Sequence, residues 1–595
     1  MIKNAGQKNI ARKVNAVRTV GRAGKMFLFA VLVLQSLLMY AQPEKEGDLY
    51  QQTSEVNNVM VRYHADFGNV ARFYVIENSP ERRERLLSVV DEYIGKLEKL
   101  DFDGLNTGTK VDYILFNRDL YEMRYKLERE AREYASVKRW FPFADSVYSM
   151  EKRRRRGAIP AAQQMALDIN NMSAAVKQLM AQFEKEGAIS VESGARAEGI
   201  IRGLREALRS IAEFYNGYDP LFTWWVPKPY HRLDSLLEIY AGVIRSKEQS
   251  LTLQKKDSSG IMGNPIGVAE LGRRLQYEMI PYTPEELVAI ANKEFAFCDA
   301  EMLKASRDMG FGDNWKAALE KVKNSYVPAG EQPTTMLRLY NESVDFIEAH
   351  DLITLPSLAK ETWRMRMMTP EQQLVNPFFT GGEEFSISYP TNDMNEADKL
   401  MSMRGNNPHF SRATVHHELL AGHALQEFTT SRYKTYRHFE TPFWIEGWSL
   451  YWEMLLWDQG FAKSPEDRIG MLFWRMHRCA RIIFSLNYHT GKWTPQQCID
   501  FLVDRVGHER ANAEGEVRRS FVGGYDPLYQ IAYMLGGLQI MALKRELVDS
   551  GKMTFREFHD DFIRQNMMPI EMERAILENK PLTRDYKTAW KFYKF

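Results

Sequence analysis

Cysteine is nearly absent from this sequence. Among its 595 residues are three cysteines, Cys298, Cys479 and Cys498. An odd number without paired spacing excludes a disulfide framework and a thiolate metal site, the two features that closely spaced cysteines usually indicate. The fold must therefore be stable through packing alone.

The sequence also lacks a net charge of either sign. Lysine and arginine together number 79, and aspartate and glutamate number 78. No global basic field would attract a nucleic acid or an anionic membrane, so we expect neither partner. The basic run from Lys152 to Arg156 is isolated in this neutral chain, and we expect it to be a solvated loop or a helix end.

The N-terminus lacks a hydrophobic run long enough to cross a bilayer. Seven lysines and arginines from Lys3 to Lys25 precede an apolar run from Met26 to Tyr40, which is shorter than the roughly 18 residues of a spanning helix. This pattern is typical of a secretory signal peptide. We predict that residues 1–41 are cleaved and that the mature chain is periplasmic or secreted, without a stable membrane anchor. No cysteine follows the run, which excludes lipid attachment there.

Most of the remaining sequence has the periodicity of amphipathic helices. Apolar residues recur at intervals of three and four between Arg82 and Leu100, and Thr283-Pro284 followed by two glutamates is typical of a helix start. The fold class we predict is therefore mainly α, with many helices. Further helices are expected over 111–134, 162–186, 195–215, 233–245, 284–309 and 336–349.

The length favours more than one packed region, because single cores rarely extend beyond roughly 250–300 residues. We divide the mature chain near residue 355, where the pattern changes, into an N-terminal helical region (42–355) and a C-terminal region (356–595). Trp224 and Trp225 in the first region stand beside prolines. Buried aromatic packing is the interpretation we favour for them over a cleft wall.

A small β-sheet is expected just after this boundary. Residues 362–368 alternate in polarity, and residues 384–390 alternate and end in a proline. The second segment, Phe385 to Tyr389, has two interpretations. It is either an edge strand that holds an extended substrate or one arm of a structural hairpin.

Histidines cluster in the C-terminal region. Five of the twelve lie between His409 and His438, among them His416, His417 and His423. A zinc peptidase needs three protein ligands, an open position and a carboxylate base. His417-Glu418 begins like the HExxH motif, but His423 follows six residues later, which in a regular helix is about 9 Å along the axis and about 120° around it.

This spacing predicts an interrupted helix. The chain must bulge or unwind near Ala421-Gly422 for His417 and His423 to reach one metal, and glycine permits such a backbone. His416 shares a helix face with His423 and remains a competing ligand.

A second helix supplies carboxylates. Glu446 and Glu453 are seven residues apart and lie on one face, and a stripe formed by Trp444, Trp448 and Trp452 lies on another. Buried carboxylates need a partner, which a metal and its histidines would provide. Spacing alone leaves a second interpretation open, namely satisfied core histidines and surface glutamates.

The segments HELLAGH and EGWSLYWE resemble the bacterial domain of unknown function 885 (DUF885), whose patterns are HExxPGH and EGWxxYxE. The segment from Pro527 to Gly536 is similar to the PGQALSYKIG stretch of that family. The resemblance spans most of the mature chain, so both halves form one DUF885-like unit. This sequence departs from the family at Ala421, which replaces a proline, and at Leu528-Tyr529, which replace Gly-Gln.

That family in turn resembles the gluzincin metallopeptidases. The resemblance implies a metallopeptidase-like body with the small sheet near its active site, and Zn2+ as the cofactor. It also implies roles for individual residues: His417, His423 and Glu446 as the ligands, Glu418 as the general base, and Glu453 as a partner behind the ligands.

The resemblance also suggests which group would stabilise the oxyanion. Tyr533 matches a family tyrosine, with Tyr525 and His489 as alternatives. Arg519 is either a partner for a substrate carboxylate or a structural ion-pair residue. The function we predict is an exported zinc peptidase acting on a peptide substrate. Two alternatives remain, a helical binding protein without activity and a metal-dependent hydrolase of other amides or esters.

Overall fold

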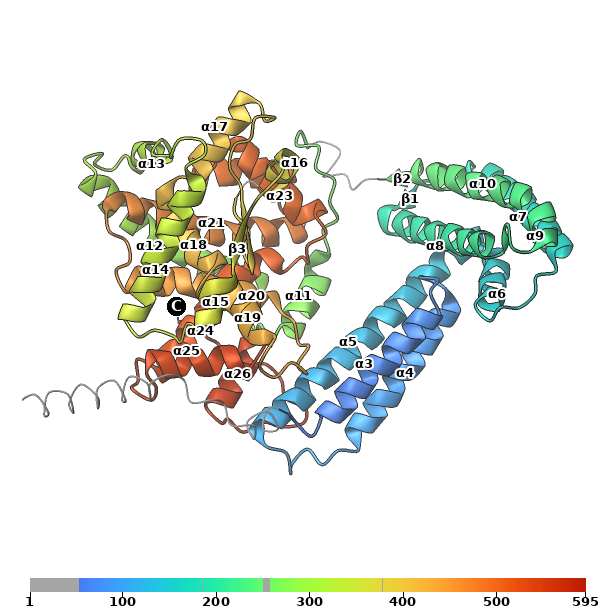
Figure 1. Ribbon diagram of the computed structural model, residues 1–595, viewed down its shortest axis with the longest axis horizontal. Coiled ribbons are helices and arrows are strands. Elements are labelled where there is room, and N and C mark those ends of the chain that lie inside the picture. The colour runs from blue at the N-terminus through green and yellow to red at the C-terminus, as the bar shows by residue number, and fades with distance from the viewer. Residues whose placement is uncertain (1–52, 186, 250–256, 377, 595) are drawn as a thin grey trace, which may run out of the picture. The chain divides into compact units, whose positions relative to one another are not determined.

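The computed structural model describes residues 53–594, apart from residues 186, 250–256 and 377. The predicted signal peptide lies outside these residues. The described residues from Ser54 onward belong to one compact unit. Helices dominate this unit, as predicted (Figure 1). Within the described residues, no helix combines the length and the apolar character that crossing a membrane requires.

Three hydrophobic clusters organise the helices, and the first two use the N-terminal part of the chain. The first cluster is built from α3 (Asn57–Phe73), α4 (Pro80–Glu98) and most of α5 (Thr107–Val137), joined by α26 (Ile570–Leu577). The second uses the end of α5 and six helices, namely η1 (Lys138–Trp140), α6 (Ala144–Arg154), α7 (Ala162–Phe183), α8 (Val191–Tyr215), α9 (Pro220–Trp225) and α10 (Pro227–Arg245).

The third cluster is the largest and contains the histidine-rich segment. Its residues run from Ile261 to Phe592, so they lie on both sides of residue 355. Its helices are α11 (Gly267–Tyr277), α12 (Pro284–Asp308), α13 (Trp315–Lys323), α14 (Gln332–Ala349), α15 (Ser357–Thr362), α17 (Glu396–Gly405), α18 (Pro408–Glu418), α19 (His423–Thr430), α20 (Pro442–Asp458), α21 (Pro465–His489), α22 (Pro495–Phe501), η3 (Leu502–Val506), α23 (Arg510–Val522), α24 (Tyr529–Leu547) and α25 (Phe555–Arg564).

Local sequence signals account for several helix ends. Helix α12 starts after Thr283, as the sequence predicts, and the Thr283 side chain and Glu286 form a capping box there. The basic run from Lys152 to Arg156 is the end of α6, where Arg154 pairs with buried Glu151 at 2.6 Å. That expectation is also confirmed.

The small sheet is present, but its strands do not form the hairpin that was one of the two interpretations. Strand β3 (Arg364–Met367) pairs with β4 (Glu384–Ile387) in parallel, and helix α16 (Pro370–Val375) lies between them in sequence. A two-residue pair, β1 (Ile189–Ser190) with β2 (Glu248–Gln249), is also parallel. Alternating polarity identified the strands but carries no information about their direction.

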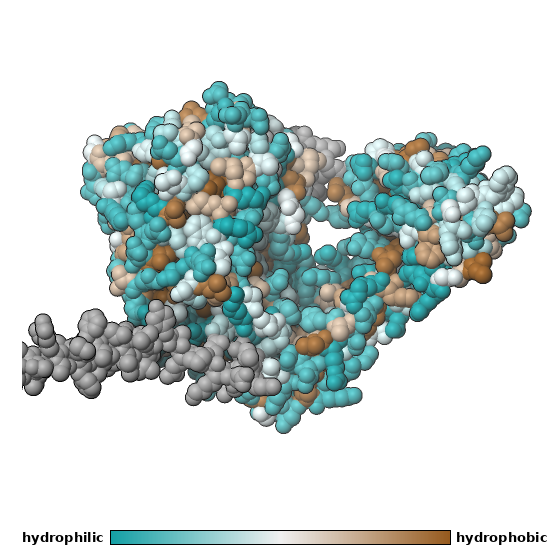
Figure 2. Space-filling view, viewed as in Figure 1, coloured by the Kyte–Doolittle hydropathy of each residue, from teal (hydrophilic) through white to brown (hydrophobic). Residues whose placement is uncertain are grey.

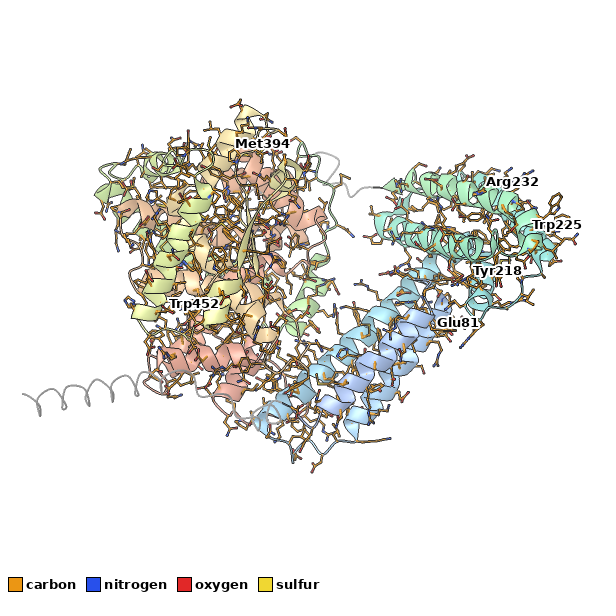
Figure 3. The ribbon with its side chains drawn as sticks, in the orientation of Figure 1. Glu81, Tyr218, Trp225, Arg232, Met394 and Trp452 are labelled. Carbon is orange, nitrogen blue, oxygen red and sulfur yellow. The ribbon has the colours of Figure 1, made fainter. Side chains whose placement is uncertain are left out.

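Trp224 and Trp225 also depart from expectation. We predicted buried packing, but Trp224 is 81% exposed and Trp225 41% exposed. Trp225 and Tyr218, which is 84% exposed, are labelled in Figure 3. On this helix only Phe222 faces the core. The cause is the length of α9, whose six residues provide a single inward position. Figure 2 shows apolar spots that interrupt the hydrophilic surface over the α7–α10 helices.

Helices α20 and α24 cross where both have glycine. A β-carbon on Gly447 would lie 2.6 Å from the Cα of Gly536, and one on Gly536 would lie 2.1 Å from the Phe443 carbonyl oxygen. Only glycine at both positions permits this approach. The crossing fixes α24 against the helix that bears Glu446.

Candidate metal centre

The chain breaks its helix between the two histidines, as the spacing predicts. Helix α18 ends at Glu418, and α19 begins at His423. A β-carbon on Gly422 would lie 1.9 Å from the carbonyl oxygen of His417, so only glycine fits at this break. The interruption brings His423 back toward His417, and their ring centres are 4.9 Å apart.

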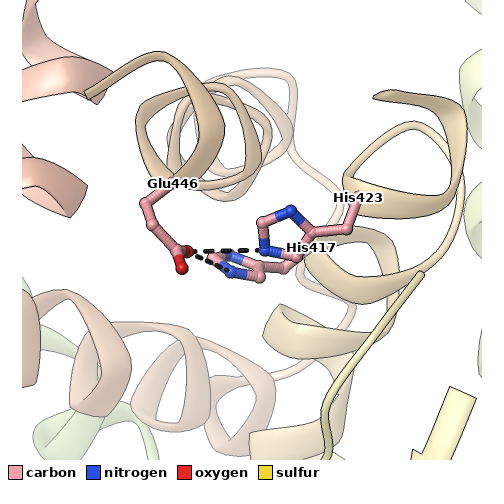
Figure 4. Close-up of side chains that lie close together, drawn as sticks. All are labelled: His417, His423 and Glu446. Carbon is pink, nitrogen blue, oxygen red and sulfur yellow. Dashed lines mark ion pairs between the residues drawn. The ribbon is translucent and has the colours of Figure 1, made fainter. Parts of the chain in front are cut away.

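Helix α20 adds the third member of the group. Glu446 on this helix faces the two imidazoles. Its Oε2 atom lies 3.5 Å from His417 Nε2 and 3.4 Å from His423 Nε2 (Figure 4). These ligand-type atoms all lie within 4.8 Å of one another. Two imidazoles and a carboxylate that converge in this way could hold a metal ion.

The tryptophan face of α20 packs into the core, which directs Glu446, on another face, toward the two histidines. Trp444, Trp448 and Trp452 are all 0% exposed and belong to the largest hydrophobic cluster. Figure 3 shows Trp452 among the site-bearing helices. The indole nitrogen of Trp448 donates a hydrogen bond to the carbonyl oxygen of Ala421 at 2.7 Å, which ties α20 to the helix break. The predicted division of α20 into tryptophan and carboxylate faces is confirmed.

The second nitrogen of each imidazole has its own partner. His417 Nδ1 lies 2.7 Å from Glu453 Oε1, and His423 Nδ1 lies 2.9 Å from Gln426 Oε1. The Gln426 amide in turn donates to the Ile445 carbonyl oxygen at 3.1 Å. Such partners fix the ring orientation and direct the Nε2 atoms toward one point.

His416, the competing ligand in the sequence, is outside this group. It is fully buried, its ring packs edge-on against Phe461, and within the described part of the chain neither ring nitrogen has a hydrogen-bond partner. Burial lowers the pKa of His416 to about 3. The structure thus brings His417, and not His416, next to His423 and Glu446.

A cavity of about 320 Å3 opens beside the three residues, and Glu418 lines it. A β-carbon on Gly381 would lie 2.5 Å from Glu418 Oε2, and the Gly382 amide donates to the Glu418 carbonyl oxygen at 3.2 Å. The chain before β4 therefore packs directly over this glutamate.

Strand β4 itself does not line the cavity. Phe385 and Tyr389 are buried in the core, and Thr380 bridges to Ser386 on the free side of the strand. Phe378 to Gly381, just before the strand, line the cavity instead. This arrangement does not favour the substrate role that we considered for Phe385 to Tyr389.

Two tyrosines of α24 face the group. Tyr533 lines the cavity, and its ring stacks parallel to that of His417 with centres 6.1 Å apart. One turn earlier on the helix, the Tyr529 hydroxyl donates a hydrogen bond to Glu446 Oε1. Tyr525 and Arg519 also line the cavity, but His489, an alternative in the sequence, does not.

Burial and mutual charge shift the pKa values of the group. Burial alone would lower the pKa of His423, but the charge of Glu446 outweighs it and raises the pKa to about 9. The pKa of Glu446 is well below its ordinary value, because His423 and His417 outweigh the effect of burial. Burial raises the pKa of Glu418. A cation that binds here must displace the proton of the imidazoles.

Some residues of the site escaped the sequence analysis. Tyr529 was considered only as a departure from the family pattern, although it lies one helical turn before Tyr533, and that spacing could have identified it. Gln426 follows His423 by three residues and could have been found in the same way. Arg478 and Arg481 line the cavity from α21, and only tertiary packing reveals them.

A family model described as "Bacterial protein of unknown function (DUF885)" matches residues 74–576. No curated protein matches the chain. A structure from Shewanella oneidensis, described as "a putative lipoprotein of unknown function", has a TM-score of 0.63 at 15% identity, and the match covers 88% of this chain and 100% of that one. A "putative lipoprotein" from Colwellia psychrerythraea has a TM-score of 0.53 at 15% identity, with 88% and 99% covered. At this identity the likeness shows a shared fold.

Proposed function

The chain belongs to the bacterial DUF885 family, which has no assigned function, and from its site we propose that it is an exported zinc-dependent peptidase. The observation that carries the proposal is the position of Glu446 Oε2, a buried oxygen without a hydrogen-bond partner in the described structure, 3.4–3.5 Å from two imidazole nitrogens.

The three residues fit zinc in chemistry and in spacing. Ligand atoms about 2.0–2.2 Å from a tetrahedral zinc lie roughly 3.3–3.6 Å from one another, close to the distances of Glu446 Oε2 from the two imidazole nitrogens. Two imidazoles and one carboxylate leave a fourth position open, as catalytic zinc sites do. His417, His423 and Glu446 would hold the ion. When bound, zinc polarises a carbonyl oxygen and makes water more acidic.

The remaining groups would perform proton transfer and charge stabilisation. Glu418, whose pKa is raised by burial, would take a proton from the attacking water and pass it to the leaving amine nitrogen. The hydroxyl of Tyr533 would donate to the oxygen that gains negative charge. Glu453 would hold His417 through Nδ1, and Tyr529 would hold Glu446 through Oε1.

Export is supported by the N-terminal sequence and by the relatives in fold. A basic segment followed by a short apolar run is typical of a cleaved signal. The two similar structures are each described as a "putative lipoprotein", and lipoproteins are a class of exported proteins.

The test is the substitution Glu418→Gln, which preserves the size of the side chain and removes its basicity. We expect zinc content and folding to persist while hydrolysis of a mixed peptide pool falls by about two to four orders of magnitude. Glu440→Gln, at an exposed glutamate of the same region, is the matched control. Zinc content is measured by elemental analysis, and each variant is assayed at equal zinc occupancy.

The results separate the proposal from its rivals. Full activity in zinc-loaded Glu418→Gln would contradict the mechanism. Zinc-loaded wild type that cleaves small amides or esters but no peptide would be a different hydrolase. Wild type without activity on any of these compounds would be a binding protein.

A further inference from the structure

Three arginines line the cavity beside the candidate metal centre. Arg478 and Arg481 lie one turn apart on α21, and Arg519 lies on α23. The side chains of Arg478 and Arg481 are 5% and 4% exposed, and that of Arg519 is 14% exposed. Guanidinium groups are costly to bury without partners, so their partners are informative.

These three arginines form ion pairs with only two carboxylates among the described residues. Arg478 Nη2 lies 3.3 Å from Glu453 Oε1, and Arg481 Nε lies 2.7 Å from Glu516 Oε1. Arg519 Nε is 3.9 Å from Glu516 Oε2. Arg481, Glu516 and Arg519 thus form a triad in which a single carboxylate lies between two guanidinium groups. The triad has one positive charge that no described carboxylate within ion-pair distance balances.

The triad also has unused hydrogen-bond donors. Arg481 Nη1 and Arg519 Nε are buried and have no hydrogen-bond partner in the described part of the chain. Arg519 makes no hydrogen bond there through its side chain, and its guanidinium lies 4.9 Å from the centre of the Tyr525 ring. A guanidinium offers a planar fork of donors that matches a carboxylate.

The position of these donors relative to the proposed chemistry defines the ligand. The guanidinium carbons of Arg478 and Arg481 lie 4.5 Å and 4.3 Å from the centre of the Tyr533 ring. Because a phenolic oxygen is about 3 Å from its ring centre, each of these guanidinium carbons is at most about 7 Å from the Tyr533 hydroxyl, no more than the length of two extended residues.

We propose that the Arg481–Glu516–Arg519 triad binds the free C-terminal carboxylate of the substrate, so that the protein is a carboxy-terminal exopeptidase. The C–N bond that breaks is one or two residues from the C-terminus. Water supplies the hydroxyl group of the new carboxylate and the hydrogen of the released amine. This inference rests on the proposed peptidase function and adds the substrate class to it.

The first experiment compares three peptides that differ at the last residue: a free acid, its amide, and an amide with glutamate at that position. With zinc-loaded wild type we expect kcat/KM for the free acid to exceed that for its amide by about 100-fold. Mass spectrometry should show the loss of one or two C-terminal residues. Equal cleavage of acid and amide, or cleavage at internal bonds, would overturn the inference but leave the peptidase function intact.

The glutamate amide separates two sources of a carboxylate. If it is cleaved as fast as the free acid, the arginines recognise a side chain and the exopeptidase assignment is wrong. We expect it to behave like the plain amide.

The second experiment uses Arg519→Ala, with Arg518→Ala as a matched control. Both positions are on α23, but Arg518 is exposed. Arg519→Ala should lower kcat/KM for the free acid by about 10- to 100-fold and leave the amide within about threefold. Arg518→Ala should change neither rate. A parallel loss on acid and amide would assign Arg519 a structural role and overturn the inference.

Binding to metal-free protein gives a measure that does not depend on turnover. A fluorescent peptide acid should bind at least about 10-fold more tightly than its amide, and Arg519→Ala should abolish the difference. Equal binding of acid and amide by wild type would overturn the inference. If no peptide is hydrolysed but this difference is present, the proposed function fails and carboxylate recognition by the triad stands.

Discussion

Helices α7–α10 and helices α18–α24 differ in the chemistry of their interiors. Apart from tyrosines, Ser173 is the one buried polar side chain among the described residues of α7–α10. The interior of α18–α24 is rich in charge. Its buried side chains include His416, His417, Glu446, Glu453, Asp467, His477, Arg478, Arg481, His508 and Glu516.

The two regions also differ in how deeply their tryptophans are buried. The three tryptophans spaced by four on α20 are fully buried, whereas Trp224 on α9 is 81% exposed. Burying charge reduces stability unless the charge is paired, and exposing a tryptophan forgoes its hydrophobic contribution. The α7–α10 region thus has the interior expected when packing alone is required. The polar interior of α18–α24 is the feature that locates the candidate site.

We expect the largest effect in the α18–α24 region from the loss of a proposed zinc ligand. His423→Ala should abolish tight zinc binding and reduce peptide hydrolysis by at least about 1,000-fold, because a site with two remaining ligands holds zinc weakly. Elemental analysis and a peptide assay measure both effects. The matched control is His416→Ala, which should retain zinc. If His416→Ala lost zinc and His417→Ala kept it, the assignment of ligands would be wrong by one residue.

A pair of tryptophan substitutions compares the two interiors directly. Trp448→Ala should lower the free energy of unfolding by about 3–5 kcal/mol, because it opens a cavity and removes the bond to Ala421. Trp224→Ala should change it by about 0.5 kcal/mol or less. Denaturant titrations measure both. Similar losses at the two positions would break the comparison.

A buried carboxyl just after α11 should make stability depend on pH. Burial raises the pKa of Glu278, next to Thr441 at the start of α20, to about 7. Between about pH 4.5 and 7 the native state then binds more protons than the unfolded state, so stability falls as pH rises through this window. We expect a fall of about 3 kcal/mol. Glu278→Gln should flatten the profile measured by thermal unfolding, and an unchanged profile would contradict the assignment.

The smallest expected effect tests the tyrosine behind the ligand. Tyr529→Phe removes the hydroxyl that donates to Glu446 Oε1 and should weaken zinc affinity by about 10- to 100-fold without unfolding the protein. Competition with a chelator measures the affinity. Tyr525→Phe, whose ring packs against Tyr529 with centres 4.7 Å apart, is the control. Equal effects in both variants would remove the specific role of Tyr529.

Much of the fold follows from patterns that act over a few residues. The helix period, the helix start at Thr283 and the break near Gly422 are local, and the structure confirms each of them. The convergence of His417, His423 and Glu446 was implied by family resemblance, and the structure brings the three together. Their roles as ligands remain predictions.

Other features depend on contacts between distant segments. The parallel pairing of β3 with β4 is set by a crossover through α16, which alternating polarity cannot encode. The Arg481–Glu516–Arg519 triad joins α21 to α23. In a sequence with 79 lysines and arginines, nothing in the sequence shows which carboxylate a given arginine will pair with.

The glycine contact between α20 and α24 limits how this site can be transplanted to another protein. Because Gly447 and Gly536 bring the two backbones together, the separation of Glu446 from Tyr529 and Tyr533 is a property of the helix pair. A graft of the two histidines and the glutamate onto a foreign helix would reproduce the ligands but not the tyrosines that face them. The smallest portable unit is therefore the crossed pair together with the interrupted helix.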